Sequence, residues 1–324
     1  MKINRTHISL ILWVIAIWIL SQAIHNWPPL DSWLAHISWQ TLLAIGTLVV
    51  GLSLATLIRT YRWGLLLQSQ IRFNWKTITA VYGWSFLLAT FTPFRSGELV
   101  RPLWVRKQGG CSFHSFALMV TERIADILIL TALLLIWIYT LTDQNIPSFI
   151  TPMLPWVCIL LFVFFLMTPW LSKQLQNQQI CPKALGNRPR AVQWCSQLLE
   201  GLQAFGSAPE RIKIFFVTLT VWGVLITAYI VALMFLLPDI PITAAIGVVC
   251  LINLSTLIFM APGHIGIFEL AVIMALSPYN IEEEASLQAA VWLHLGVLIA
   301  IILIGGISWV YLRWINSSSV KEAA

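Results

Sequence analysis

Two short polar breaks in otherwise apolar sequence carry the side chains best placed to do chemistry. The first break spans 92–101 (TPFRSGELVR) and the second spans 261–269 (APGHIGIFE). Each contains a Pro followed four residues later by a Gly, and these residues interrupt helices. Their titratable residues are Arg95, Glu98, Arg101, His264 and Glu269. Polar interruptions at corresponding places in two halves of an apolar chain indicate a transporter-like binding site.

Further charges follow the first break in the motif Glu122-Arg123-x-x-Asp126. The residues that we expect in a low dielectric are Arg95, Glu98, Arg101, Glu122, Arg123, Asp126 and Glu269. An unpaired charge at the centre of a membrane helix costs roughly 2.5–3.5 kcal/mol. Left unpaired, seven such charges would exceed the whole stability of a typical domain. These side chains must therefore pair with one another, reach water, or do both.

The spacing of these charges predicts some of their contacts. Glu98 and Arg101 are three residues apart, which favours an ion pair on one helix face. Glu122 and Asp126 are four residues apart, so two acids share a face and repel each other. We expect a cation between them, supplied by Arg123, Arg95 or a substrate. The charges form either a structural salt-bridge knot or a substrate contact, and both interpretations stay open.

The second break offers a different chemistry. Gly263 and Gly266 allow close backbone approach and leave amides free near a helix start, which favours an anion. Glu269 either closes the break by accepting from those amides or contacts a substrate or proton, while His294 is expected to bond a neighbouring helix. The full candidate set for substrate binding is Arg95, Gly97, Glu98, Arg101, Glu122, Arg123, Asp126, Pro262, Gly263, His264, Gly266 and Glu269.

Motifs for cofactor or metal chemistry are missing from the sequence. It contains no P-loop, no HExxH, no GxSxG and no metal-spaced set of His or Cys residues. We therefore expect no cofactor and no metal, and a transporter is favoured over an enzyme.

Composition defines the class of protein. Of the 324 residues 59% are hydrophobic and 10% are charged, and the mean hydropathy is +0.83. Soluble domains carry about 25% charged residues, so this chain cannot cover a water-facing surface. We predict an all-α integral membrane protein with membrane lipids rather than nucleic acid as its partners. In a membrane protein the positions of the basic residues indicate the orientation of the chain, so the net charge of +6 is not evidence for binding to nucleic acid.

Apolar segments divide the chain into spans and hairpins. Six apolar segments are long enough to cross a membrane. These predicted spans are 7–26, 41–60, 113–139, 153–171, 212–237 and 286–312. The regions 76–108 and 241–277 are predicted to be helical hairpins, each with one break. All of these elements form one transmembrane domain, 1–324.

The distribution of basic residues predicts the orientation. With these spans, sixteen of the nineteen Lys and Arg residues, Arg59 and Arg62 among them, fall on the side of the N-terminus. That side is therefore cytoplasmic, and both termini face the cytoplasm of a bacterial-type inner membrane. The hairpins then open on opposite faces, which predicts an inverted repeat with halves near 41–139 and 212–314. The cytoplasmic loop 172–210 is expected to contain an interfacial amphipathic helix.

At these motifs the chain resembles the lysylphosphatidylglycerol synthase transmembrane-region family, also called the flippase-like domain family. The resemblance rests on Arg-Ser-Gly-Glu at 95–98 with Arg101, on Glu122-Arg123-x-x-Asp126, and on Pro-Gly-x-x-Gly-x-x-Glu at 262–269. In bifunctional members this region is implicated in moving aminoacylated phosphatidylglycerol between leaflets, and a synthase domain follows it. The 324 residues are expected to form a stand-alone member, so lipid aminoacylation is not implied.

The leading hypothesis is a lipid translocase that acts on a phospholipid or a lipid-linked envelope precursor. Arg95, Arg101 and Arg123 would hold a lipid phosphate, and the acids would balance them or hold a cationic head group. One alternative is a membrane enzyme that transfers a group to or from a lipid-linked substrate, with Glu98 or Asp126 as general base. Another is a non-transporting partner of a lipid-biosynthetic enzyme.

Overall fold

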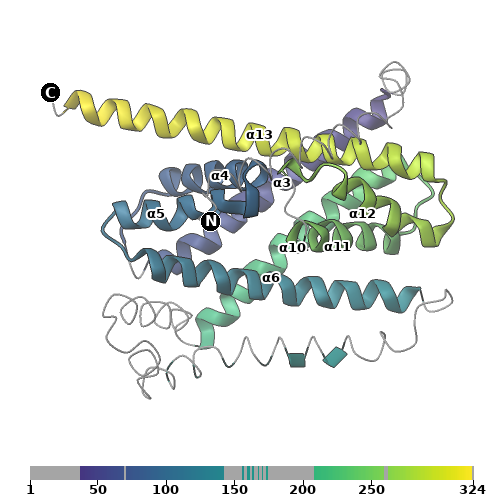
Figure 1. The fold of residues 1–324 in the computed structure, drawn as a ribbon, viewed down its shortest axis with the longest axis horizontal. Coiled ribbons are helices and arrows are strands. Elements are labelled where there is room, and N and C mark those ends of the chain that lie inside the picture. The colour runs from purple at the N-terminus through teal and green to yellow at the C-terminus, as the bar shows by residue number, and fades with distance from the viewer. Residues whose placement is uncertain are drawn as a thin grey trace, which may run out of the picture.

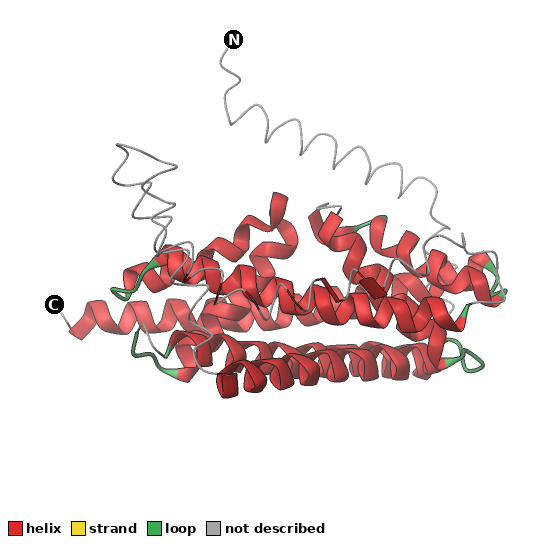
Figure 2. Ribbon diagram, turned by 90° about the horizontal axis from the view of Figure 1, so that it is seen from below, coloured by secondary structure: helices red, strands yellow, loops and turns green. Residues whose placement is uncertain are grey.

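The computed structural model describes residues 37–68, 71–141, 208–258 and 262–322, with scattered positions between 155 and 173. Within these ranges every regular element is a helix and no strand occurs (Figures 1 and 2). The predicted all-α class is therefore confirmed. The predicted span 7–26 and the amphipathic helix of loop 172–210 lie outside the described residues, as does most of span 153–171.

Apart from two C-terminal ends, the described helices follow the predicted boundaries to within four residues. In chain order they are α3 (Trp39–Leu67), α4 (Trp75–Phe91), the 3-10 helix η1 (Pro93–Leu99), α5 (Val100–Lys107), α6 (Ser112–Thr140), α10 (Ala208–Leu236), α11 (Ile242–Ile258), the 3-10 helix η2 (Pro262–His264), α12 (Ile267–Leu276), the 3-10 helix η3 (Ser277–Tyr279) and α13 (Glu283–Glu322). Both predicted hairpins are present, with η1 and η2 at their breaks.

Two boundaries correct the sequence analysis. Helix α13 runs to Glu322, ten residues past the predicted end at 312. Helix α3 does not stop near residue 60 but continues to Leu67. Arg62, predicted to lie in a loop on the side of the N-terminus, is a fully buried helical residue with a side chain only 2% exposed. The apolar run resumes after it with Trp63 and Leu66, and both pack in the core. An arginine whose charge is paired can lie inside a helix, so the charge of Arg62 did not mark the end of the span.

The long helices frame the two hairpins (Figure 1). Helix α13 runs along one side of the bundle and α6 along the other, with α4 and α5 between them at one end and α11 and α12 at the other. Helix α10 packs along α3, and α13 packs on both α3 and α4. The hairpins meet where η2 contacts α4, and a Cβ added to Gly263 would lie 3.6 Å from a ring carbon of Phe91.

Two apolar cores hold this arrangement, one around each hairpin. The first joins α3, α4, α5 and α6, with Ile214 of α10, through residues such as Trp63 and Leu118. The second joins α3, α6, α10, α11, α12 and α13 through residues such as Leu233 and Val248. Among the described helices, three are long and apolar enough to cross a membrane, within 39–67, 212–236 and 283–315. Large apolar side chains on their outer faces remain exposed, as expected of a surface that meets lipid.

The two halves share an order of elements. Helix α3 and helix α10 each have 29 residues, α4 and α11 each have 17, and a break, a short helix and a long helix follow in both cases. This order agrees with the predicted halves. The inverted symmetry itself and the orientation in the membrane remain predictions.

The close contact of α3 with α10 gives a test of the fold. A Cβ at Gly51 would lie 2.3 Å from Cβ of Ala228, whereas a Cβ at Gly46 on the same helix meets nothing within 4 Å. We expect Gly51→Ala to lower the melting temperature of the purified protein, because the helices must separate. Gly46→Ala should raise or preserve it, since Ala favours a helix by about 1 kcal/mol over Gly. Equal melting temperatures for the two variants would contradict this packing.

Candidate functional site

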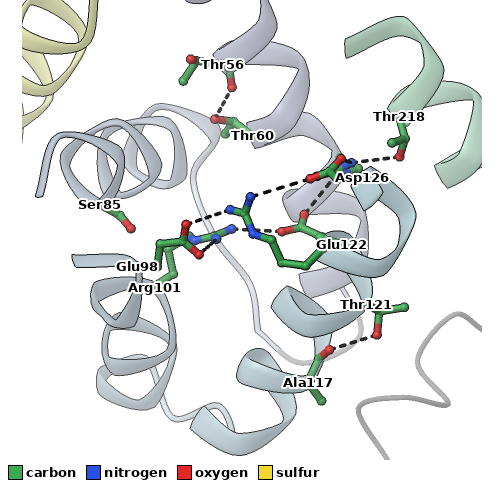
Figure 3. Close-up of polar contacts among 12 residues, drawn as sticks. Thr56, Thr60, Ser85, Glu98, Arg101, Ala117, Thr121, Glu122, Asp126 and Thr218 are labelled. Atoms are coloured by element: carbon green, nitrogen blue, oxygen red, sulfur yellow. Dashed lines mark hydrogen bonds and ion pairs between the residues drawn. The ribbon is translucent and has the colours of Figure 1, made fainter. Parts of the chain in front are cut away.

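Four charged residues form a balanced inner cluster: Arg62, Arg101, Glu122 and Asp126. Arg62 donates from Nε to Glu122 Oε1 at 3.3 Å and from Nη1 to Asp126 Oδ1 at 3.0 Å. Arg101 donates from Nη1 to Glu122 Oε2 at 3.1 Å. Figure 3 shows Glu122 and Asp126 on one helix, with Arg101 facing Glu122 from another. No side chain of this cluster is more than 9% exposed, so each charge depends on its partners.

Arg62 answers the prediction that a cation must separate Glu122 and Asp126. Among the expected sources, Arg95 makes no ion pair with either acid and Arg123 reaches only Asp126, at 3.9 Å. The cation that bridges the two acids is instead Arg62 of α3. Two neutral side chains of α10 complete the hydrogen bonds of this ion pair: Thr218 Oγ1 accepts from Arg62 at 2.9 Å, and the Trp222 indole donates to Asp126 at 3.3 Å.

A second group, the outer cluster, consists of Arg59, Arg95, Glu98 and Arg123. Arg95 Nε and Arg123 Nη2 both donate to Glu98 Oε1, at 2.9 and 2.8 Å. The predicted pair of Glu98 with Arg101 is confirmed at 3.6 Å and links the two clusters. Arg95 and Arg123 are 20% and 34% exposed, so this cluster is more open than the inner one.

The first break is built by η1 folding back on α4. The Gly97 amide donates to Thr92 Oγ1 at 2.9 Å, and the Gly97 carbonyl accepts from Ser85 Oγ at 3.0 Å. A Cβ on Gly97 would lie 2.3 Å from the backbone nitrogen of Ala89, so only glycine fits here. The amide and carbonyl of Gly97 are therefore hydrogen-bonded by neutral side chains, and no charged side chain is needed for these bonds.

The second break is closed by Glu269 and His294. Glu269 Oε2 accepts from the Gly266 amide at 2.7 Å. This amide is therefore not free for an anion, and closure of the break, one of the two roles that the sequence analysis weighed for Glu269, is confirmed. His294 of α13 lies 2.6 Å from Glu269 Oε1 through Nδ1 and 2.8 Å from the Gly263 carbonyl through Nε2. The expected bond from His294 to another helix is confirmed. The two oxygens of Glu269 thus contact the Gly266 amide and His294, and both contacts help to close the break.

The contacts of His294 constrain its protons. The Gly263 carbonyl only accepts, so Nε2 must carry a hydrogen. Nδ1 then meets the Glu269 carboxyl either as an N–H donor of imidazolium or as an acceptor from a protonated acid. Through these two contacts His294 joins α13 to the second break.

Both breaks hold a residue with positive φ two positions after the proline. Arg95 has φ of 51° and His264 has φ of 57°, a region that non-glycine residues seldom occupy. Such backbone is concentrated at binding sites. Both side chains line the same cavity, so the shared backbone pattern aims one titratable group from each break at a common space.

The cavity is lined by side chains from both cores and from both breaks. Its volume is about 130 Å³. Pockets for drug-sized ligands measure roughly 300–1,000 Å³, so this conformation has room for part of a lipid head group but not for a whole lipid. Its polar lining comprises Arg59, Tyr82, Thr90, Arg95, Arg123, Asp126, Trp222, Tyr229, Asn253, Thr256 and His264.

The structure places the predicted site residues in three groups. Arg95, Arg123, Asp126 and His264 line the cavity, while Glu98, Arg101 and Glu122 lie behind it in the ion-pair clusters. Gly97, Gly263, Gly266 and Glu269 shape the breaks. Pro262 begins η2.

Sequence reasoning missed Arg59 and Arg62 in α3 and the α10 residues Trp222 and Tyr229. The apolar residues that follow Arg62 were a usable signal for the arginines, because they show that the helix continues. No local pattern distinguishes Trp222 or Tyr229 from the many other aromatic residues of the chain.

These features define a helical membrane protein with two broken hairpins around a charged cavity. Comparison with family profiles matches residues 6–305 to the lysylphosphatidylglycerol synthase TM region. The chain belongs to this family, which confirms the resemblance and supports a membrane protein. Searches among curated proteins and among solved structures gave no match.

The inner cluster predicts a large effect of removing Arg62. Arg62→Met would leave Glu122 and Asp126 facing each other without their shared cation, and breaking a buried pair in this way costs about 3–5 kcal/mol. We expect a marked fall in melting temperature, partly recovered when Asp126→Asn is added. Arg72 is exposed, so Arg72→Met should change stability by no more than about 0.5 kcal/mol. Similar effects for the two single variants would refute the role assigned to Arg62.

Proposed function

We propose that this protein is a lipid translocase that moves a phosphate-bearing lipid, either a phospholipid or a lipid-linked envelope precursor, between the leaflets of a bacterial-type inner membrane. The observation that carries the proposal is a single cavity into which both breaks direct side chains, Arg95 from the first and His264 from the second. Membership of a family associated with flippase-like function supports it.

The charges favour a phosphate over a cationic head group. Arg59, Arg95 and Arg123 line the cavity, and arginine binds phosphate oxygens with paired N–H donors. Each carboxylate of the two clusters is already paired with at least two arginines. No acid in the described clusters is therefore left to receive an ammonium group.

Transport also fits the placement of the acids better than group transfer does. A general base must reach a substrate proton, but Asp126 accepts from Arg62 and Trp222, and Glu98 accepts from Arg95 and Arg123. Such carboxylates are held as anions by their donors. Two broken hairpins around one cavity instead suit a substrate that passes from one leaflet to the other.

A reconstituted translocation assay tests this function. Purified protein in liposomes, with fluorescent phospholipids and an outer-leaflet quencher, should lose protection of the inner leaflet faster than empty liposomes. Arg95→Gln should slow the loss at least tenfold, because a charge-assisted hydrogen bond contributes about 1.5–3 kcal/mol.

Arg72→Gln serves as the matched control, since this exposed arginine lies outside the cavity. Its rate should equal that of the wild type, and the melting temperatures of all three proteins should be recorded. Rates equal to those of empty liposomes with anionic, zwitterionic and polyprenyl lipids alike would overturn the proposal. Product formation from a lipid-linked substrate, abolished by Asp126→Asn, would establish the enzyme instead.

A further inference from the structure

The charges around the cavity do not balance. The inner cluster has two arginines and two carboxylates, so it is neutral. The outer cluster has Arg59, Arg95 and Arg123 against Glu98 alone. Asp126 of the inner cluster also lines the cavity and lies 3.9 Å from Arg123, so the two clusters are counted together. Their five arginines and three carboxylates leave an excess of two positive charges beside the cavity.

Arg59 contributes most directly to this excess. It lies in α3, three residues before Arg62, and is partly exposed within the cavity lining. Arg62 is held by two acids and a threonine, but Arg59 makes no hydrogen bond or ion pair with any residue that the structure describes. Its guanidinium group therefore keeps its donors available to a ligand.

Arg95 and Arg123 also retain donors. Both bind the same oxygen of Glu98, so one carboxylate oxygen serves two guanidinium groups. Arg95 uses only Nε in this contact, and its two terminal nitrogens make no other bond among the described residues. Three arginines with spare N–H groups thus converge on a cavity of about 130 Å³.

We propose, on the basis of the function above, that the ligand group bound here carries two negative charges, as a phosphate monoester or a diphosphate does. A phosphate monoester carries about 1.5–2 negative charges at pH 7, which matches the excess. A phosphodiester supplies only one charge and leaves a cation uncompensated at low dielectric, which is costly. A head group with a net positive charge, such as that of an aminoacylated phospholipid, adds to the imbalance and is rejected.

The diphosphate or monoester group can arrive on a lipid or in a soluble anion, and the experiment separates these sources. Purified protein in neutral detergent is titrated with phosphatidate, phosphatidylglycerol, phosphatidylcholine or inorganic pyrophosphate, and binding is followed by the shift in melting temperature. Phosphatidate should bind at least tenfold more tightly than phosphatidylglycerol, and phosphatidylcholine should bind more weakly still. Saturable binding of pyrophosphate alone would support the same charge match with a soluble ligand.

Two variants make the test specific. Arg59→Gln removes one of the two excess charges, so it should reduce the preference for phosphatidate over phosphatidylglycerol to less than threefold, while phosphatidylglycerol binding persists. Arg72→Gln should leave the preference unchanged. Equal affinities for the two lipids in the wild type, or an equal loss for both lipids in Arg59→Gln, would overturn the inference.

The outcome is independent of the translocation assay. A charge preference without translocation would support this site and reject the translocase. Translocation without any charge preference would support the translocase and reject the site for a doubly charged group.

Discussion

The repulsion between Glu122 and Asp126 is the constraint on which the rest of the site depends. Both acids lie on one face of α6, and neither is more than 9% exposed. Arg62 and Arg101 resolve the repulsion from two other helices, α3 and α5. For Arg62 to reach them α3 must continue past its first charge, and for Arg101 to reach them the first hairpin must break and restart. The course of three helices thus follows from two buried carboxylates.

The breaks satisfy their own backbone, which leaves the cavity charges available. In the first, Thr92 and Ser85 bond the amide and carbonyl of Gly97. In the second, Glu269 and His294 bond Gly266 and Gly263. Buried backbone groups must be paired, and here neutral or mutually balanced partners supply the pairing. Arg95 and His264 are therefore exposed to the cavity by the backbone at each break without being consumed in closing it.

The sequence predicted the elements far better than it predicted the contacts. Composition and apolar runs were sufficient for the membrane class and both hairpins, because helix length and polarity are local properties. The pairing of Glu98 with Arg101 also followed from helical spacing. Arg62 was misplaced because its charge resembled a helix end, and its partners lie 60 and 64 residues away in the chain. The sequence offered closure of the break by Glu269 as one of two roles, and the packed structure was needed to show that contact and the places of Trp222 and Tyr229.

The ion pairs show which helices must stay together if one hairpin moves against the other. Arg62, Arg101, Glu122 and Asp126 come from α3, α5 and α6, so their ion pairs stay intact in any motion that keeps these three helices together. Toward α10 they are linked only through neutral groups, the hydroxyl of Thr218 and the indole of Trp222, which water can replace. At the other junction, η2 rests on α4. A shift of η2 away from α4 would widen the cavity at this junction while the buried charges stay paired, and the proposed translocase would need such a change to admit a whole head group.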